Sequence, residues 1–122
     1  MGQGVVSSER VEPGIEVITF SGEHDLNTTP QLRDKLTAAI QERVPVVVDL
    51  SGADFIDSSI LGEVLDARHR AEDTGLGFAV VLTNGAPSVG RVLEVTGLDS
   101  SLPVHKTRAA AIKEARAGPS GG

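Results

Sequence analysis

The sequence predicts an α/β domain in which helices connect the strands of a largely parallel sheet. Its 122 residues switch repeatedly between strand-like and helix-like hydrophobic periodicity. Two of the strand-like runs, residues 46–50 and 78–82, are almost wholly apolar, which is typical of parallel strands buried on both faces. Strands that alternate with helices need crossover connections, so we expect the order β-β-α-β-α-β-α-β-α with one antiparallel edge strand.

The opening segments predict two strands followed by a helix. Residues 15–20 are rich in β-branched side chains and partly alternate, and a weaker strand is expected at residues 5–11. The Pro-Gly pair at residues 13–14 is the predicted turn between them. A helix then begins around Pro30, which suits a first-turn position. Its apolar residues recur at helical spacing: Leu32, Leu36, Ala39 and Ile40.

The second predicted helix starts near Ser58, directly after the strand at residues 46–50 and the loop that follows it. Its apolar stripe is broad and is interrupted by Arg68. The stripe consists of Ile60, Leu61, Val64, Leu65, Ala67 and Ala71. Gly75 and Gly77 flank the turn into the next strand.

The C-terminal part predicts a short helix, a short strand and a last helix. The short helix turns Val89, Val92 and Leu93 inward. Residues 102–105 are a strand candidate. The last helix covers residues 108–117, with Thr107 as its N-cap and Ile112 as its main apolar contact.

Length and composition indicate one intracellular domain. We expect a single folded unit at residues 5–116, with flexible termini at residues 1–4 and 117–122, because the ends are rich in small and polar residues. The absence of cysteine excludes disulfides and thiolate chemistry. No signal peptide and no long apolar run are present, so a cytoplasmic protein without a membrane partner is expected.

The charge balance disfavours nucleic acid as a partner. Seventeen Asp and Glu residues against eleven Lys and Arg give a formal net charge of −6. Affinity for nucleic acid comes largely from cations that neutralise phosphates. With three Phe and no Tyr or Trp, side chains on which bases could stack are scarce as well.

Function is expected at the carboxyl ends of the strands, where ligands bind in open α/β sheets. The loops predicted there are residues 21–29, 51–59 and 83–88. Asp57, Ser58 and Ser59 stand at the predicted start of a helix, where a side-chain oxygen serves as an N-cap. The same position tolerates an anion such as phosphate, so a structural and a regulatory hypothesis both stay open.

Enzymatic and metal-binding motifs are absent from the sequence. It contains no Gly-x-Ser-x-Gly elbow and no phosphate-binding glycine loop. His24, His69 and His105 lie in separate segments without the spacing of metal ligands. We therefore expect no cofactor, no metal and no catalytic residues, while Asp25 is a loop or capping carboxylate on sequence grounds.

Residues 46–62 resemble the signature of the anti-sigma-factor antagonists, the bacterial STAS domains. In that family a buried strand leads to an Asp-Ser-Ser/Thr-Gly-Leu motif at a helix start, and the run here ends in Asp-Ser-Ser-Ile-Leu-Gly. Residues 21–25, 84–91 and 95–98 resemble further pieces of the family pattern. The resemblance covers about residues 5–116 and includes the order of the elements.

This resemblance implies a regulatory switch in transcription and stress response rather than an enzyme. The unphosphorylated protein would bind a serine-kinase anti-sigma factor and thereby release a sigma factor. The kinase would phosphorylate Ser58, which abolishes binding, and a PP2C-type phosphatase would reverse the modification. The residues expected to contact the partner are His24, Asp25, Asp57, Ser59 and Ile60.

Ile60 departs from the family pattern, which has glycine at this position. The side chain is expected either to narrow access to Ser58 or to add an apolar contact for a particular partner. Which of Ser58 and Ser59 accepts the phosphate stays open at this stage.

Two alternatives keep the α/β fold but change the function. One is a STAS scaffold or ligand-binding module in which Ser58 is never phosphorylated. The other is a receiver-like domain phosphorylated on Asp49, which ends the apolar run before the second loop, with Lys106 after the last strand. A receiver needs an acidic pair for Mg²⁺ just after the first strand, and Glu23 and Asp25 lie well past Phe20.

Overall fold

The computed structural model describes residues 4–11, 14–24, 28–83, 87–97, 100 and 102–118. Its described part contains a five-stranded sheet in the order β1-β2-β3-β4-β5. The pair β1–β2 is antiparallel and the other pairs are parallel, as the sequence predicts. The elements are β1 Val5–Val11, β2 Ile15–His24, α1 Thr29–Gln41, β3 Val46–Ile56, α2 Ser58–Thr74, β4 Phe78–Val81, α3 Pro87–Thr96, β5 Val104–His105 and α5 Arg108–Ala117.

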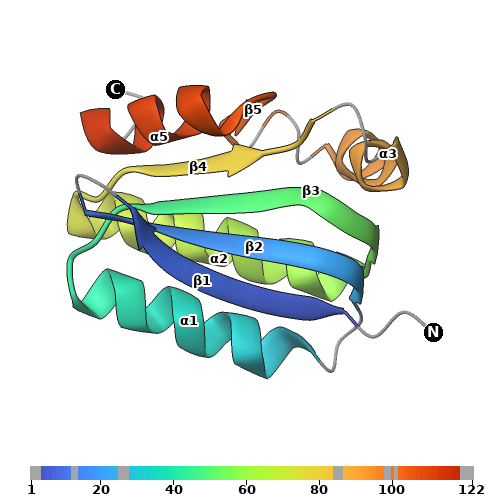
Figure 1. Ribbon diagram of the computed structural model, residues 1–122, viewed down its shortest axis with the longest axis horizontal. Helices are drawn as coiled ribbons and strands as arrows, with labels where there is room; N and C mark the ends of the chain where they lie inside the picture. Colours follow the sequence, from blue (N-terminus) through green and yellow to red (C-terminus); the bar gives the residue numbers. More distant parts are fainter. Residues whose placement is uncertain are drawn as a thin grey trace.

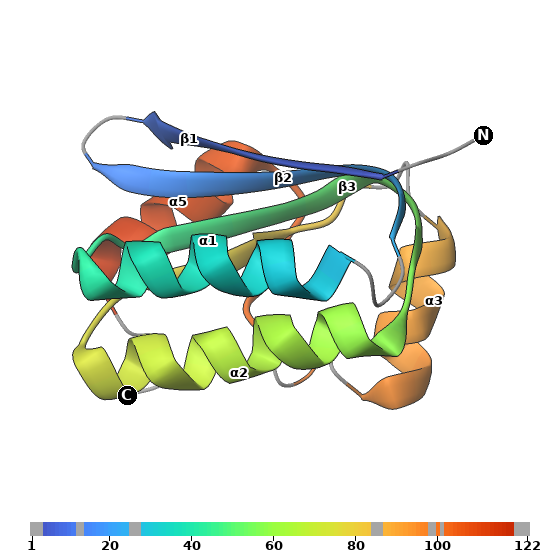
Figure 2. The ribbon, with the colours of Figure 1, turned by 90° about the horizontal axis from the view of Figure 1, so that it is seen from below.

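Helices cover both faces of the sheet. The helices α1 and α2 lie side by side along one face, whereas α5 packs on the other (Figures 1 and 2). The larger core lies between the sheet and α1, α2 and α3. A smaller core under α5 joins the starts of β2 and β3, through Val17 and Val47, to Ala111 and Ala115. The carboxyl ends of β2 and β3 therefore extend beyond the part of the sheet that α5 covers.

The strands β2 and β3 run further than the sequence predicts. Loops were expected from residues 21 and 51, but the ladder continues to His24 and Ile56. The physical reason is that backbone groups make the ladder, so polar and glycine residues can extend a strand when a partner strand runs alongside. Gly52 suits such a position because a Cβ there would lie 2.7 Å from the carbonyl oxygen of Phe20.

Two register shifts bend β3 as it approaches α2. Thr19 pairs with Asp49, but Ser21 pairs with Gly52, so β3 contains one residue more than β2 over this stretch. A second shift follows between Gly22 and Glu23. Extra residues of this kind are β-bulges, which bend a strand and turn side chains to a different side. Figure 2 shows β3 curving at this end toward the start of α2.

The contact of α5 with the sheet differs from the prediction. Thr107 caps the helix as expected, since its Oγ1 accepts the N–H of Ala110 at 3.1 Å. The buried residues of α5 are Ala111 and Ala115, whereas Ile112 is only partly buried, so Ile112 as the main apolar contact was wrong. The small residues are needed because the backbone passes close by: a Cβ on Gly77 would lie 1.8 Å from the Ala115 carbonyl oxygen.

The close approach of α5 predicts opposite effects at two glycines. Gly77→Ala should lower the free energy of unfolding by about 2 kcal/mol, since a methyl group there overlaps backbone that cannot move away cheaply. Gly62→Ala is the control: it lies in α2, where an added methyl group would have no neighbour within 4 Å, and should raise stability by about 0.5–1 kcal/mol. Urea unfolding of both variants measures the difference, and equal stabilities would contradict this packing.

Candidate functional site

The N-terminus of α2 presents a capped helix start with two serines. Asp57 is the N-cap, with φ −71° and ψ 149°, and its Oδ1 accepts the backbone N–H of Ser59 at 2.8 Å. Ser58 is the first residue of α2, and both serines are exposed. The structural hypothesis of an N-cap is thus confirmed for Asp57. The regulatory hypothesis stays open, because Asp57 and not Ser58 provides the cap.

The two serine hydroxyls differ in their surroundings. The pKa of Asp57 lies below its ordinary value because the backbone N–H and the hydroxyl of Ser59 both donate to its carboxylate. Asp57 is therefore ionised over the whole neutral range, and the Ser59 hydroxyl is engaged with it. Among the described residues, none hydrogen-bonds the hydroxyl of Ser58. Ser58 is the more available of the two hydroxyls.

Ile60 is part of the core and offers no surface to a partner. Its side chain is fully buried and packs with Leu61 and Val64 in the cluster between the sheet and the helices. The expectation that Ile60 contacts a partner is therefore wrong. The reason is the helix geometry: residue 60 falls on the inward stripe of α2, whereas Ser58 and Ser59 precede it on the exposed side.

The other two expected contact residues come from the end of β2. His24 is the last residue of β2 and pairs with Ile56, so its backbone lies beside the end of β3, one residue before Asp57. Its side chain and the whole of Asp25 lie outside the described residues. The register places this end of β2 next to the start of α2, and the contacts of both side chains stay predictions.

Asp49 belongs to a structural ion-pair network and does not fit the receiver alternative. It is 7% exposed and lies in the middle of β3, seven residues before the strand ends. Its Oδ2 accepts Arg108 Nε at 2.9 Å, and its Oδ1 accepts the N–H of Ser51 at 2.9 Å. Arg108 also donates to Thr19 Oγ1 at 3.0 Å and pairs with Glu9 at 3.6 Å, so the network joins α5 to three strands. Asp49 is therefore buried in an ion pair within the strand, whereas a phosphoacceptor aspartate must be accessible to its phosphodonor.

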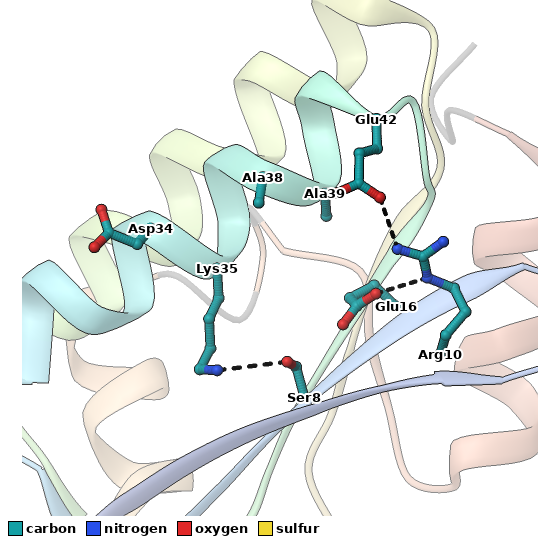
Figure 3. Close-up of a pocket in the computed structure, with 8 residues that line it drawn as sticks. All are labelled: Ser8, Arg10, Glu16, Asp34, Lys35, Ala38, Ala39 and Glu42. Carbon is teal, nitrogen blue, oxygen red and sulfur yellow. Dashed lines mark hydrogen bonds and ion pairs between the residues drawn. The ribbon is translucent and has the colours of Figure 1, made fainter.

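A polar cavity of about 260 Å³ lies between β1 and α1 (Figure 3). Most of its charged groups bind one another: Arg10 pairs with Glu16 at 2.7 Å and with Glu42 at 3.0 Å. Lys35 donates to the hydroxyl of Ser8 at 3.5 Å. Because two carboxylates already neutralise Arg10, its ion pairs connect β1 to β2 and to the end of α1. The cavity is separate from the site that the sequence predicts at the carboxyl ends of the strands.

Neither a metal site nor a membrane span is found in the described part of the chain. Those residues contain no group of three or more His, Cys, Asp and Glu side chains placed to hold a metal ion. No helix among them is both long and apolar enough to cross a membrane.

Comparison with known proteins identifies the family. The sequence model of the STAS domain matches residues 8–111. The chain belongs to the STAS domain family. This STAS domain is 32% identical over 103 residues to a protein of Paenibacillus polymyxa named as an anti-sigma F factor antagonist, covering 83% of the chain and 86% of the relative.

Solved structures show the same fold. A crystal structure of an anti-sigma factor antagonist from Mycobacterium paratuberculosis superposes on this STAS domain with a TM-score of 0.80 at 29% identity, covering 93% and 95% of the two chains. The anti-sigma factor antagonist SpoIIAA in its unphosphorylated form gives 0.75 at 29% identity, covering 93% and 97%. Phosphorylated SpoIIAA, from Bacillus, gives 0.66 at 28% identity, covering 89% and 97%.

Sequence reasoning missed one exposed residue beside the site. Phe55 lies in the run 51–59 that was predicted to be a loop, and it is instead the penultimate residue of β3. Its side chain is 49% exposed. Gly22 and Gly52 could have indicated the bulges, since glycine inside a strand often marks one. Nothing in the sequence shows toward which side of the sheet a bulge turns the residues that follow.

Proposed function

We propose that this STAS domain, at residues 5–116, is an anti-sigma factor antagonist that phosphorylation of Ser58 switches off. The unphosphorylated protein binds a serine-kinase anti-sigma factor, and a sigma factor is released. The observation that carries the proposal is the exposed Ser58 hydroxyl, free of hydrogen bonds from the described residues, at the first position of a capped helix. Support comes from the relatives, which are named as anti-sigma factor antagonists and include one solved in a phosphorylated form.

The free protein can carry a phosphate at Ser58. A phosphoserine adds about −1.5 to −2 charges, and the free N–H groups and dipole of a helix N-terminus stabilise an anion by about 0.3–1 kcal/mol. The neighbouring Asp57 is ionised and repels it, but both groups face water, which screens the repulsion. The modified protein is therefore expected to keep its fold.

A bound partner removes that screening. An interface covers Ser58 and excludes water, so a phosphate there loses hydration that the helix N-terminus replaces only in part. A serine kinase also holds a nucleotide whose phosphates lie where the serine hydroxyl must approach, so a phosphoserine meets further negative charge. Each loss of about 1.4 kcal/mol of binding free energy weakens binding tenfold. One phosphate at Ser58 is therefore sufficient to separate the complex. A PP2C-type phosphatase would restore the binding form.

Asp57, Ser59, His24 and Asp25 are the proposed contacts around Ser58. The first two flank it at the start of α2, and the others follow from the pairing of β2 with β3. The sequence feature that favours the scaffold alternative without phosphorylation is Ile60 in place of the family's glycine. Because Ile60 is buried, no observation now favours that alternative.

The acceptor serine can be identified directly. The protein is incubated with MgATP and each serine-kinase anti-sigma factor encoded in its own genome, and the phosphate is located by fragment mass spectrometry. We expect one phosphate on Ser58, and none in the Ser58→Ala variant. Ser59→Ala is the matched control and should still be modified. Phosphate on Ser59 instead, or on neither serine with any of the kinases, would refute the proposal.

A further inference from the structure

Phe55 is the one aromatic side chain of this protein that faces solvent. All three aromatic residues are phenylalanines and all lie in the described part of the chain. Phe20 and Phe78 are 0% and 3% exposed, whereas Phe55 is 49% exposed. Aromatic side chains bury a large apolar area when they are covered and contribute strongly to interfaces. It lies two residues before the N-cap Asp57.

A β-bulge turns Phe55 outward. Gly22 pairs with Ala53 and Glu23 pairs with Phe55, so Asp54 is an extra residue in β3. Ala53 and Ile56 are both buried in the same core. In a regular strand Phe55 would share the inward side with Ala53, because side chains alternate. The extra residue reverses this and exposes Asp54 and Phe55 together.

The helix α5 does not cover the end of β3 where Phe55 lies. The cluster under α5 contains residues from the starts of β2 and β3, such as Ile15 and Val47, and not from their ends. Two further large hydrophobic residues are exposed in the described part of the chain: Val5, at 57%, and Val95, at 80%. They belong to the start of β1 and to α3, which lie at the same end of the molecule as the end of β3 and the start of α2 (Figures 1 and 2).

The charge next to Phe55 indicates the chemistry of its partner. Asp54 is exposed beside the ring. No ion pair formed within the described residues includes Asp54 or Asp57. The complementary surface is therefore an apolar pocket for the phenyl ring with a lysine or arginine at its rim facing Asp54.

We propose that Phe55 is the apolar anchor by which this STAS domain binds its serine-kinase anti-sigma factor, held outward by the bulge at Asp54 so that the ring enters the partner three residues before Ser58. This inference rests on the proposed function and adds to it an apolar contact on which the affinity depends. Large aromatic residues near the centre of an interface typically dominate its binding energy.

Titration calorimetry tests the anchor. The probe is each purified serine-kinase anti-sigma factor of the same genome, loaded with MgADP so that no phosphate transfer occurs. Phe55→Ala should weaken binding about 30-fold or more, and Phe55→Leu by less, because leucine keeps part of the apolar contact. Ile112→Ala is the control, since Ile112 is a partly buried apolar residue of α5, which packs over the starts of β2 and β3, and should change the affinity by less than about threefold. Circular dichroism should show the same fold for all variants.

The outcomes separate the anchor from the function. If wild type binds a kinase and Phe55→Ala binds within threefold of it, or no more weakly than Ile112→Ala, the anchor is refuted and the proposed function stands. If wild type binds none of the kinases, the proposed function is refuted and the anchor with it. A loss confined to the Phe55 variants supports both.

Discussion

Ser58→Asp is expected to weaken binding to the serine-kinase anti-sigma factor by about 100-fold while the fold stays intact. The substitution places a carboxylate at the first position of α2, where water surrounds it in the free protein and the partner covers it in the complex. A charge left unpaired in an interface costs about 2–5 kcal/mol, and 2.7 kcal/mol corresponds to about 100-fold. Calorimetric titration of the partner with the variant measures the loss.

Two matched variants isolate the position of the charge. Ser58→Ala removes the hydroxyl without adding charge and should bind within about threefold of wild type. Ser8→Asp makes the same exchange on β1, at an exposed residue away from α2, and should also bind normally. If Ser58→Asp binds as well as Ser58→Ala, charge at this residue does not control binding.

Ile60→Ala is expected to lower the free energy of unfolding by about 4 kcal/mol and to leave the partner affinity unchanged. The side chain is fully buried between the sheet and α2, so the truncation loses its transfer free energy and leaves a cavity. Ile112→Ala is the control, because Ile112 is only partly buried and should cost about 1 kcal/mol. Urea unfolding followed by circular dichroism gives both values.

The affinity of Ile60→Ala decides between a core residue and a contact residue. Titration at a temperature where the variant is fully folded should give a dissociation constant within about twofold of wild type. A contact residue at a protein interface would instead lose affinity with little loss of stability. Weak binding combined with normal stability would contradict the burial of Ile60.

The order of elements could be predicted from the sequence because periodicity reports which face is buried. The stripe from Ile60 to Ala71 predicted α2, and Thr107 was identified as the cap of α5. The ends of β2 and β3 could not be predicted, because their polar and glycine residues form strands only when the partner strand is present. Ile112 was overestimated because sequence shows size, whereas the contact at Gly77 admits only small residues of α5.

In the candidate site, too, some features could be predicted from local sequence and others depend on the fold. Asp57 as the cap and Ser58 at the helix start could be predicted, since local capping chemistry is written in adjacent residues. The burial of Ile60 depends on the rotation of α2 against the sheet, and the exposure of Phe55 depends on one extra residue in β3. No local pattern in the sequence shows whether the side chain of Ile60 or of Phe55 points into the core or toward solvent.

The most direct test of the switch compares the protein with itself in two forms. Wild type phosphorylated at Ser58, verified by intact mass, and the same sample after treatment with a PP2C-type phosphatase are each titrated with the MgADP-bound kinase. The phosphorylated form should bind at least about 100-fold more weakly, and treatment should restore full affinity. Equal affinities for the two forms would show that a phosphate at Ser58 does not govern partner binding.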